Sequence, residues 1–177
     1  MSLSGGLLAT YIVSKGDAFW TFSGGLAGII GASAGNDLYH PIQALIIGGI
    51  VPVIAYKLHH YVERRFKLDD AVGAVAVHGY AGFMGVVIAG FVLWGAPSSP
   101  FEGYAAINPL GPFAGAIIMF FVLGFAPAYI VTRIQSAFGV LRIPPEVELQ
   151  GLDFADHHAY ENAIAEITSA THEHLKS

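Results

Sequence analysis

The sequence predicts an all-α integral membrane protein with about five transmembrane helices and a short polar tail. Of its 177 residues, 54% are hydrophobic and 12% are charged, whereas an ordinary soluble domain is about 25% charged. Nine of the 21 charged residues fall in the last 38 positions, and 21 of the 22 glycines precede position 140. We therefore expect a transmembrane domain at residues 1–139 and a cytoplasmic tail at residues 140–177.

Five apolar stretches are candidate membrane spans, which need about 20 residues each. The first is short, and it lacks the basic start and the small-residue cleavage site of a signal peptide. The third has a short apolar core but extends through Leu58 to Tyr61, whose polar ends suit the membrane interface. In chain order the stretches are residues 3–13, 18–34, 42–56, 71–95 and 110–131.

Small residues recur at intervals of four in two of these stretches. The second stretch carries Gly24, Gly28 and Ala32, and the fifth begins with Gly111 and Gly115. Membrane helices approach one another closely along such faces. The pattern therefore predicts close helix contacts and favours a bundle over a lone anchor.

The basic residues predict an orientation. All eight lysines and arginines fall on one side of the five spans, and the opposite loops, residues 35–41 and 96–109, contain none. The positive-inside rule then places the amino terminus outside and the carboxyl terminus in the cytoplasm. Because the number of spans is odd and the first is short, we expect the chain to be the back part of a longer protein.

Composition also excludes several classes of function. The net charge is −5 and no run of lysine or arginine exceeds two, so no surface for nucleic acid is expected. The chain has no cysteine, which rules out disulfides and thiolate metal sites. The histidines of the tail lack a regular ligand spacing, so we expect neither a metal nor a cofactor. They are His157, His158, His172 and His174.

His78 is the main candidate functional residue. It lies eight residues past Asp70, or about 12 Å along a helix, which places it inside the hydrocarbon. Two interpretations remain open: a functional group of a transport pathway, or a histidine that donates one hydrogen bond across a tight helix interface. The positions that share its predicted helical face are all small. They are Ala71, Ala74, Ala81, Gly82, Gly85 and Ala89.

The other charged and imidazole groups receive simpler interpretations. His59 and His60 lie at the basic end of the third span, where we expect them to reach the lipid headgroups. His40 lies in an external loop and is expected to be solvated. Asp69 and Asp70 precede the fourth span and favour the positive end of its dipole, so we interpret them as capping residues.

Three motifs carry a resemblance to one known family. Residues 23–28 read Ser-Gly-Gly-Leu-Ala-Gly, similar to an Asn-Gly-x-Leu-Ala-Gly motif. Residues 69–79 run from an Asp-Asp pair to a His-Gly pair. Residues 141–143 and 146–153, followed by His157 and Tyr160, match a cytoplasmic tail. Together they resemble the carboxyl-terminal half of the ammonium transporter family.

The resemblance implies that the five helices correspond to spans seven to eleven of an eleven-span transporter of ammonium or ammonia. Such a protein is not an enzyme, and it lies in the plasma membrane. In the family, two histidines line a narrow hydrophobic pore, and His78 matches the second of them. The first belongs to the fifth span, which this sequence lacks. We expect Ala74 to line the substrate pathway beside His78.

The resemblance also implies partners besides the lipid bilayer and the substrate. Family members form homotrimers, and the tail packs under the bundle and influences gating, so we expect Gly151, Leu152 and Asp153 to be regulatory. A PII-type signal protein binds the same cytoplasmic face in some members. The sequence departs from the family pattern at Ser23, where asparagine is usual, and at Tyr80, directly after the His-Gly pair.

Two other functions were weighed against transport. The chain could be a noncatalytic membrane subunit, or an inactive remnant, that packs against other helices and transports nothing. It could also be a haem-binding electron carrier, but that needs two axial ligands at matching depth and only His78 lies deep. Transport is the function that the sequence favours.

Overall fold

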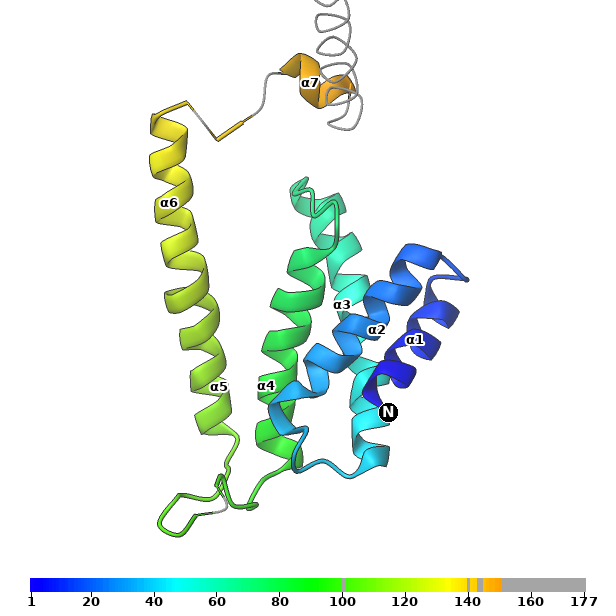
Figure 1. Ribbon diagram of the computed structural model, residues 1–177, viewed down its shortest axis with the longest axis vertical. Coiled ribbons are helices and arrows are strands. Elements are labelled where there is room, and N and C mark those ends of the chain that lie inside the picture. The colour runs from blue at the N-terminus through cyan, green and yellow to red at the C-terminus, as the bar shows by residue number, and fades with distance from the viewer. Residues whose placement is uncertain (100, 140, 143–144, 151–177) are drawn as a thin grey trace, which may run out of the picture. The chain divides into compact units, whose positions relative to one another are not determined.

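The computed structural model describes residues 1–99, 101–139, 141–142 and 145–150 (Figure 1). Within these residues the regular elements are helices, and the only β-type pairing is an isolated bridge between Pro97 and Ala106. The predicted all-α class is therefore confirmed. The chain divides into two compact units, Met1–Ala126 and Pro127–Ser177. The predicted division between residues 139 and 140 stays a prediction.

The helices follow the five predicted stretches, although several of their ends differ. The second helix stops at Ala32, the third extends to Phe66, and the fourth starts later than residue 71. In chain order the elements are α1 (Ser2–Val13), α2 (Ala18–Ala32), the 3-10 turn η1 (Ser33–Gly35), α3 (Pro41–Phe66), the π-helical segment η2 (Val75–Tyr80), α4 (Ala81–Val92), α5 (Leu110–Ile117), the π-helical segment η3 (Ile118–Phe125), α6 (Ala126–Ala137) and α7 (Pro145–Gln150).

Three continuous helical stretches among the described residues are long and apolar enough to cross a membrane. They are Pro41–Phe66, Val75–Val92 and Leu110–Ala137. Helix α1 is apolar but has only 12 residues, as the sequence predicted. The last of the three long stretches exposes nearly all of its apolar side chains, a surface that suits lipid or further helices rather than water.

Local capping explains where the helices begin. Asp17 precedes α2, and its side chain accepts a hydrogen bond from the backbone N–H of Trp20 at 2.7 Å. His40 precedes α3, and its Nδ1 accepts from the N–H of Ile42 at 3.3 Å while Gln43 Oε1 accepts from the N–H of His40. This reciprocal pair satisfies backbone donors that a helix start leaves without partners. His40 is exposed, as predicted, but it also has this structural role.

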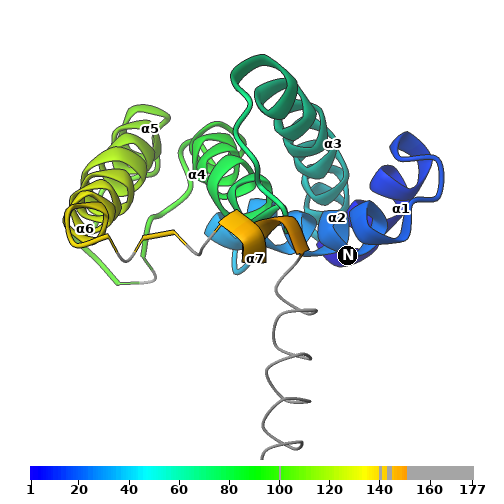
Figure 2. The same ribbon diagram turned by 90° about the horizontal axis from the view of Figure 1, so that it is seen from above.

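Packing in the first unit centres on α2. Helix α1 packs against α2 and α3, and α2 also packs against α4, which in turn contacts α5. Seen from above, α2 extends from α1 to α4 (Figure 2). The buried core draws mainly on α2, α3 and α4 and includes Ala32, Val51, Ala55 and Ala81. Helix α2 therefore determines how α3 and α4 are placed around the candidate site.

Glycines allow the helices of this unit to approach closely. A Cβ atom at Gly28 would lie 2.6 Å from the carbonyl oxygen of Ser2 and 2.9 Å from that of Gly48. Both distances are far below van der Waals contact, so the backbones meet at this position. The predicted contact face of Gly24, Gly28 and Ala32 is confirmed, because all three are buried.

At the start of the fifth stretch the same idea stays a prediction. No heavy atom among the described residues lies within 4 Å of a Cβ atom built at Gly111 or Gly115. Gly111 and Gly115 therefore have open space beside them in the described chain, whereas Ala116 of the same helix is buried. Spacing indicates which residues could form a contact face, but a second helix must be present to use it.

Candidate functional site

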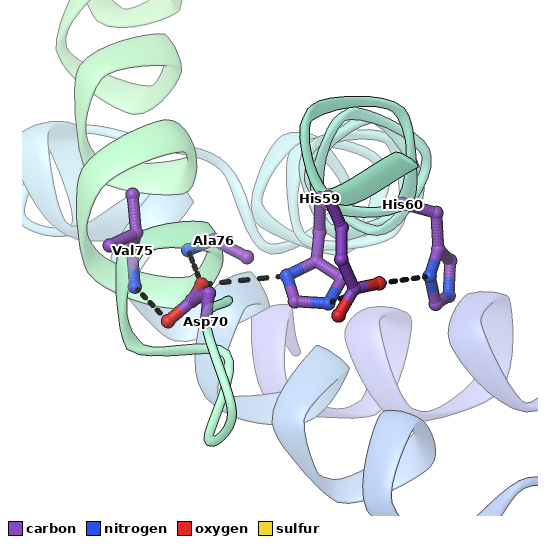
Figure 3. A network of polar contacts seen from close by, with 6 residues as sticks. His59, His60, Asp70, Val75 and Ala76 are labelled. Carbon is purple, nitrogen blue, oxygen red and sulfur yellow. Dashed lines mark hydrogen bonds and ion pairs between the residues drawn. The ribbon is translucent and has the colours of Figure 1, made fainter. Parts of the chain in front are cut away.

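Asp70 starts the helical segment that carries the predicted pathway residues. Its Oδ1 accepts a hydrogen bond from the N–H of Val75 at 3.1 Å, and its Oδ2 accepts from the N–H of Ala76 at 3.0 Å (Figure 3). Gly73 lies in the intervening turn with φ +64°, a conformation that glycine adopts without strain. The predicted capping role is confirmed for Asp70. Its neighbour Asp69 is exposed.

His78 and Ala74 lie in and just before the π-helical segment η2. The N–H of Ala81 donates to the carbonyl of Ala76, five residues back, which is the spacing of a π-helix. Such segments are rare and occur frequently at functional sites. Nothing in the sequence predicted this segment. Both His78 and Ala74 are exposed, so the described part of the chain leaves their surface uncovered.

The predicted common face of His78 and its small neighbours is wrong in one respect. Ala81, Gly85 and Ala89 are buried against the other helices, whereas His78 is exposed. The prediction assumed α-helical periodicity on both sides of His78. A π-helical turn holds more residues than an α-helical turn, so positions before and after η2 lose that register.

His59 differs from its predicted position at the headgroups, and that prediction is wrong. The residue is only 6% exposed. Its Nδ1 lies 3.4 Å from Asp70 Oδ2, and its Nε2 lies 3.7 Å from Glu63 Oε2 (Figure 3). A buried imidazole needs polar partners, and these carboxylates supply them from the same helix and from the following turn.

His60 completes a cluster at the carboxyl end of α3. Its Nδ1 lies 3.5 Å from Glu63 Oε2, and about a third of its side chain is exposed. The ring of Trp20, from α2, packs edge-on at 4.6 Å from the ring of His59 and 5.3 Å from that of His60. Tyr56 packs against His60 at 4.6 Å. Two aromatic side chains therefore hold the two imidazoles in place.

An apolar cavity lies beside the π-helical segment. It has a volume of about 170 Å³ and is lined by Leu58 of α3, Tyr80 of η2, and aromatic and aliphatic residues of α4 and η3. Tyr80 belongs to the same π-helical segment as His78, but neither His78 nor Ala74 lines this cavity. The remaining lining residues are Phe83, Met84, Phe120 and Phe121.

Part of the predicted site cannot be placed. Gly151, Leu152 and Asp153, predicted to be regulatory, lie outside the described residues, as do the four tail histidines. In the described part of the second unit, Arg142 Nη2 lies 3.1 Å from Glu148 Oε1 of α7. Both side chains are largely exposed, and exposed ion pairs contribute little to stability.

Comparison with known proteins identifies related sequences. The model of the Ammonium Transporter Family matches residues 1–162. The ammonium transporter Amt2 of Methanocaldococcus jannaschii is 35% identical over 161 residues, which cover 89% of this chain and 36% of that protein. Amt2 of Archaeoglobus fulgidus is 32% identical over 157 residues, covering 82% of this chain and 32% of that protein.

A bacterial relative is more distant. The ammonium transporter of Bacillus subtilis is 26% identical over 168 residues, which cover 92% of this chain and 42% of that protein. The chain therefore spans less than half the length of each of these curated relatives. No solved structure gave a significant match.

Proposed function

The chain belongs to the ammonium transporter family, and from this premise we propose that its complete form conducts ammonium or ammonia across the plasma membrane. The relatives are named ammonium transporters. The chain corresponds to only part of their length, so the activity is proposed for a protein that also contains the spans the relatives have.

The placement of His78 is the observation that carries this proposal. It is a polar side chain in a membrane-length helix, within a π-helical turn, and uncovered by the described chain. Intramembrane ionisable residues mark transport pathways by default. Ala74, which precedes η2 and is also exposed, would line the same pathway.

The chemistry of such a pathway follows from the cost of moving charge through hydrocarbon. An ammonium ion loses its hydration there, whereas uncharged ammonia passes at much lower cost. An imidazole can donate or accept a hydrogen bond near neutral pH. His78 would therefore donate a hydrogen bond to uncharged ammonia, or accept one from it, between apolar walls.

The proposal extends to orientation and assembly. The amino terminus would lie outside and the tail in the cytoplasm, and the complete protein would form a homotrimer that a PII-type signal protein contacts. Gly151, Leu152 and Asp153 would belong to a docked regulatory tail. Gly151→Asp should then lower transport at unchanged membrane abundance, and unchanged transport would remove the regulatory role.

The test of the function uses a full transporter in which the chain is joined to the amino-terminal spans of a relative. In liposomes, His78→Ala should lower ammonium-dependent uptake by at least about tenfold, equivalent to about 1.4 kcal/mol in the barrier. In the chain without the added spans, where His78 is exposed, the same truncation should change stability by less than about 0.5 kcal/mol. His78→Glu should retain conduction, since a carboxyl group also holds a proton.

A second histidine serves as the matched control. His40→Asn keeps a side chain that caps α3, so uptake should remain at the wild-type rate. Normal uptake by His78→Ala, in a protein inserted at the wild-type level, would show that His78 is a packing residue. The chain without the added spans should give uptake no higher than empty liposomes.

A further inference from the structure

Three potential metal ligands converge at the carboxyl end of α3. His59, His60 and Glu63 each offer one ligand atom, and these atoms all lie within 4.8 Å of one another. Glu63 Oε2 lies 3.7 Å from His59 Nε2 and 3.5 Å from His60 Nδ1, and Figure 3 shows the two imidazoles side by side at this end of α3. The cluster lies outside the pathway proposed for His78.

We propose that His59, His60 and Glu63 form a binding site for a divalent metal ion of the zinc type. Two nitrogens and one carboxylate oxygen are a ligand set that zinc accepts, and tetrahedral bonds of its usual length place ligand atoms about 3.4 Å apart. The two separations from Glu63 exceed that value by only a few tenths of an ångström. The two ring nitrogens lie within 4.8 Å of each other, so the imidazoles would have to rotate toward each other to hold the ion.

Asp70 supplies the outer carboxylate that such sites commonly have. It faces the second ring nitrogen of His59, with Nδ1 and Oδ2 3.4 Å apart. A proton on Nδ1 is favoured by this carboxylate and leaves the lone pair of Nε2 directed at the metal. The backbone donors of Val75 and Ala76 hold Asp70 in turn. His59 is therefore oriented by the start of the next helix.

The surroundings provide both rigidity and access. The aromatic rings of Trp20 and Tyr56 pack against the imidazoles, which limits their rotation. Glu63 keeps 41% of its side chain exposed, and it lines a groove of about 440 Å³ with Arg64, Lys67, Leu68 and Asp69. A metal ion can enter from this groove, and water can fill the fourth coordination position.

The sequence predicted His59 and His60 at the lipid headgroups, and it predicted no metal at the tail histidines because they lack a regular ligand spacing. The tertiary structure adds contacts that the sequence spacing alone does not show. It buries His59, brings Asp70 to its far nitrogen, and directs Glu63 toward both rings. The Glu63 carboxylate can accept a hydrogen bond from a protonated ring nitrogen, or it can share a cation with both rings.

The test measures binding of Co²⁺, a spectroscopic substitute for zinc, to the purified full chain carrying no histidine tag. The chain has two tryptophans, so a Trp94→Phe background leaves Trp20, whose ring touches His59, as the reporter. We expect one equivalent of Co²⁺ to quench Trp20 fluorescence, to show the visible absorption of a low-coordinate site, and to be displaced by Zn²⁺.

Single substitutions test which side chains bind the metal ion. Glu63→Gln should weaken Co²⁺ binding at least about 100-fold, and Asp70→Asn about 10- to 100-fold, as loss of an outer carboxylate does. The pair His157→Gln and His158→Gln, adjacent histidines of the tail, is the matched control and should leave quenching of Trp20 unchanged. Circular dichroism confirms that each variant retains its helices.

Two outcomes would overturn the proposal. Wild-type affinity in a helical Glu63→Gln protein would show that the cluster does not bind the metal. The absence of Zn²⁺-reversible quenching in the wild type would show that only protons neutralise the cluster. His60→Gln, at a position where about a third of the side chain is exposed, provides an independent variant if the Glu63 substitution disturbs folding.

Discussion

Replacing Asp70 by alanine should destabilise the first unit more than any exposed acidic substitution. The change removes two hydrogen bonds to backbone N–H groups, at 3.1 and 3.0 Å, and the carboxylate that faces His59. Loss of a cap alone costs about 0.5–2 kcal/mol. Leaving a buried imidazole nitrogen without its partner adds about 1–3 kcal/mol. Because only 17% of the Asp70 side chain is exposed, we expect a total of about 3 kcal/mol.

Two measurements test this value. The free energy of unfolding in mixed micelles, measured by circular dichroism, should fall by the whole of this amount. Hydrogen exchange at the amides of Val75 and Ala76 should accelerate by about 100-fold, the factor equivalent to roughly 3 kcal/mol. Asp70→Asn keeps one acceptor oxygen and should lose about half as much stability.

Asp69→Ala is the control, because the two aspartates are adjacent and Asp69 is exposed. Its effect should stay within about 0.5 kcal/mol. Equal stability of the Asp69 and Asp70 variants, with unchanged exchange at Val75 and Ala76, would refute the assignment of Asp70 as the cap of this helix.

Two further predictions concern packing and pH. A Cβ atom at Gly85 would lie 2.4 Å from the carbonyl oxygen of Gly31, so Gly85→Ala should lower the free energy of unfolding in micelles by about 1–3 kcal/mol. Gly115 has open space around it, so Gly115→Ala should raise the free energy of unfolding by about 0.5–1 kcal/mol. Equal effects of the two variants would contradict the close approach of α2 and α4. Burial raises the pKa of Tyr39, so the folded state holds the phenol proton more tightly than the unfolded state. The resulting contribution to the free energy of unfolding is fully present below the ordinary tyrosine pKa of about 10. It is lost as the pH rises through the higher pKa of the folded state. Tyr39→Phe should remove that alkaline loss and, because the buried hydroxyl has no hydrogen-bond partner among the described residues, raise stability by about 1 kcal/mol at neutral pH; an unchanged alkaline unfolding curve would count against it.

The sequence by itself determined the class of protein, the approximate course of its helices and the cap at Asp70. These features depend on residues close together in the chain. A run of apolar side chains is enough to indicate a span, and an aspartate a few residues before a helix reaches the free N–H groups without help from other elements. For the same reason Gly24 and Gly28 were identified as a contact face.

Only the tertiary structure decided which side chains meet across elements. The place of His59 beside basic residues predicts that it reaches the lipid headgroups. In the structure, Trp20 of α2 and Asp70 of the next turn pack against it instead. The π-helical turn at His78 has no pattern in the sequence, because it depends on one backbone register shift. Spacing determines neighbours along one helix, whereas contacts between helices depend on where they cross, and that crossing is set by the packing of the whole unit.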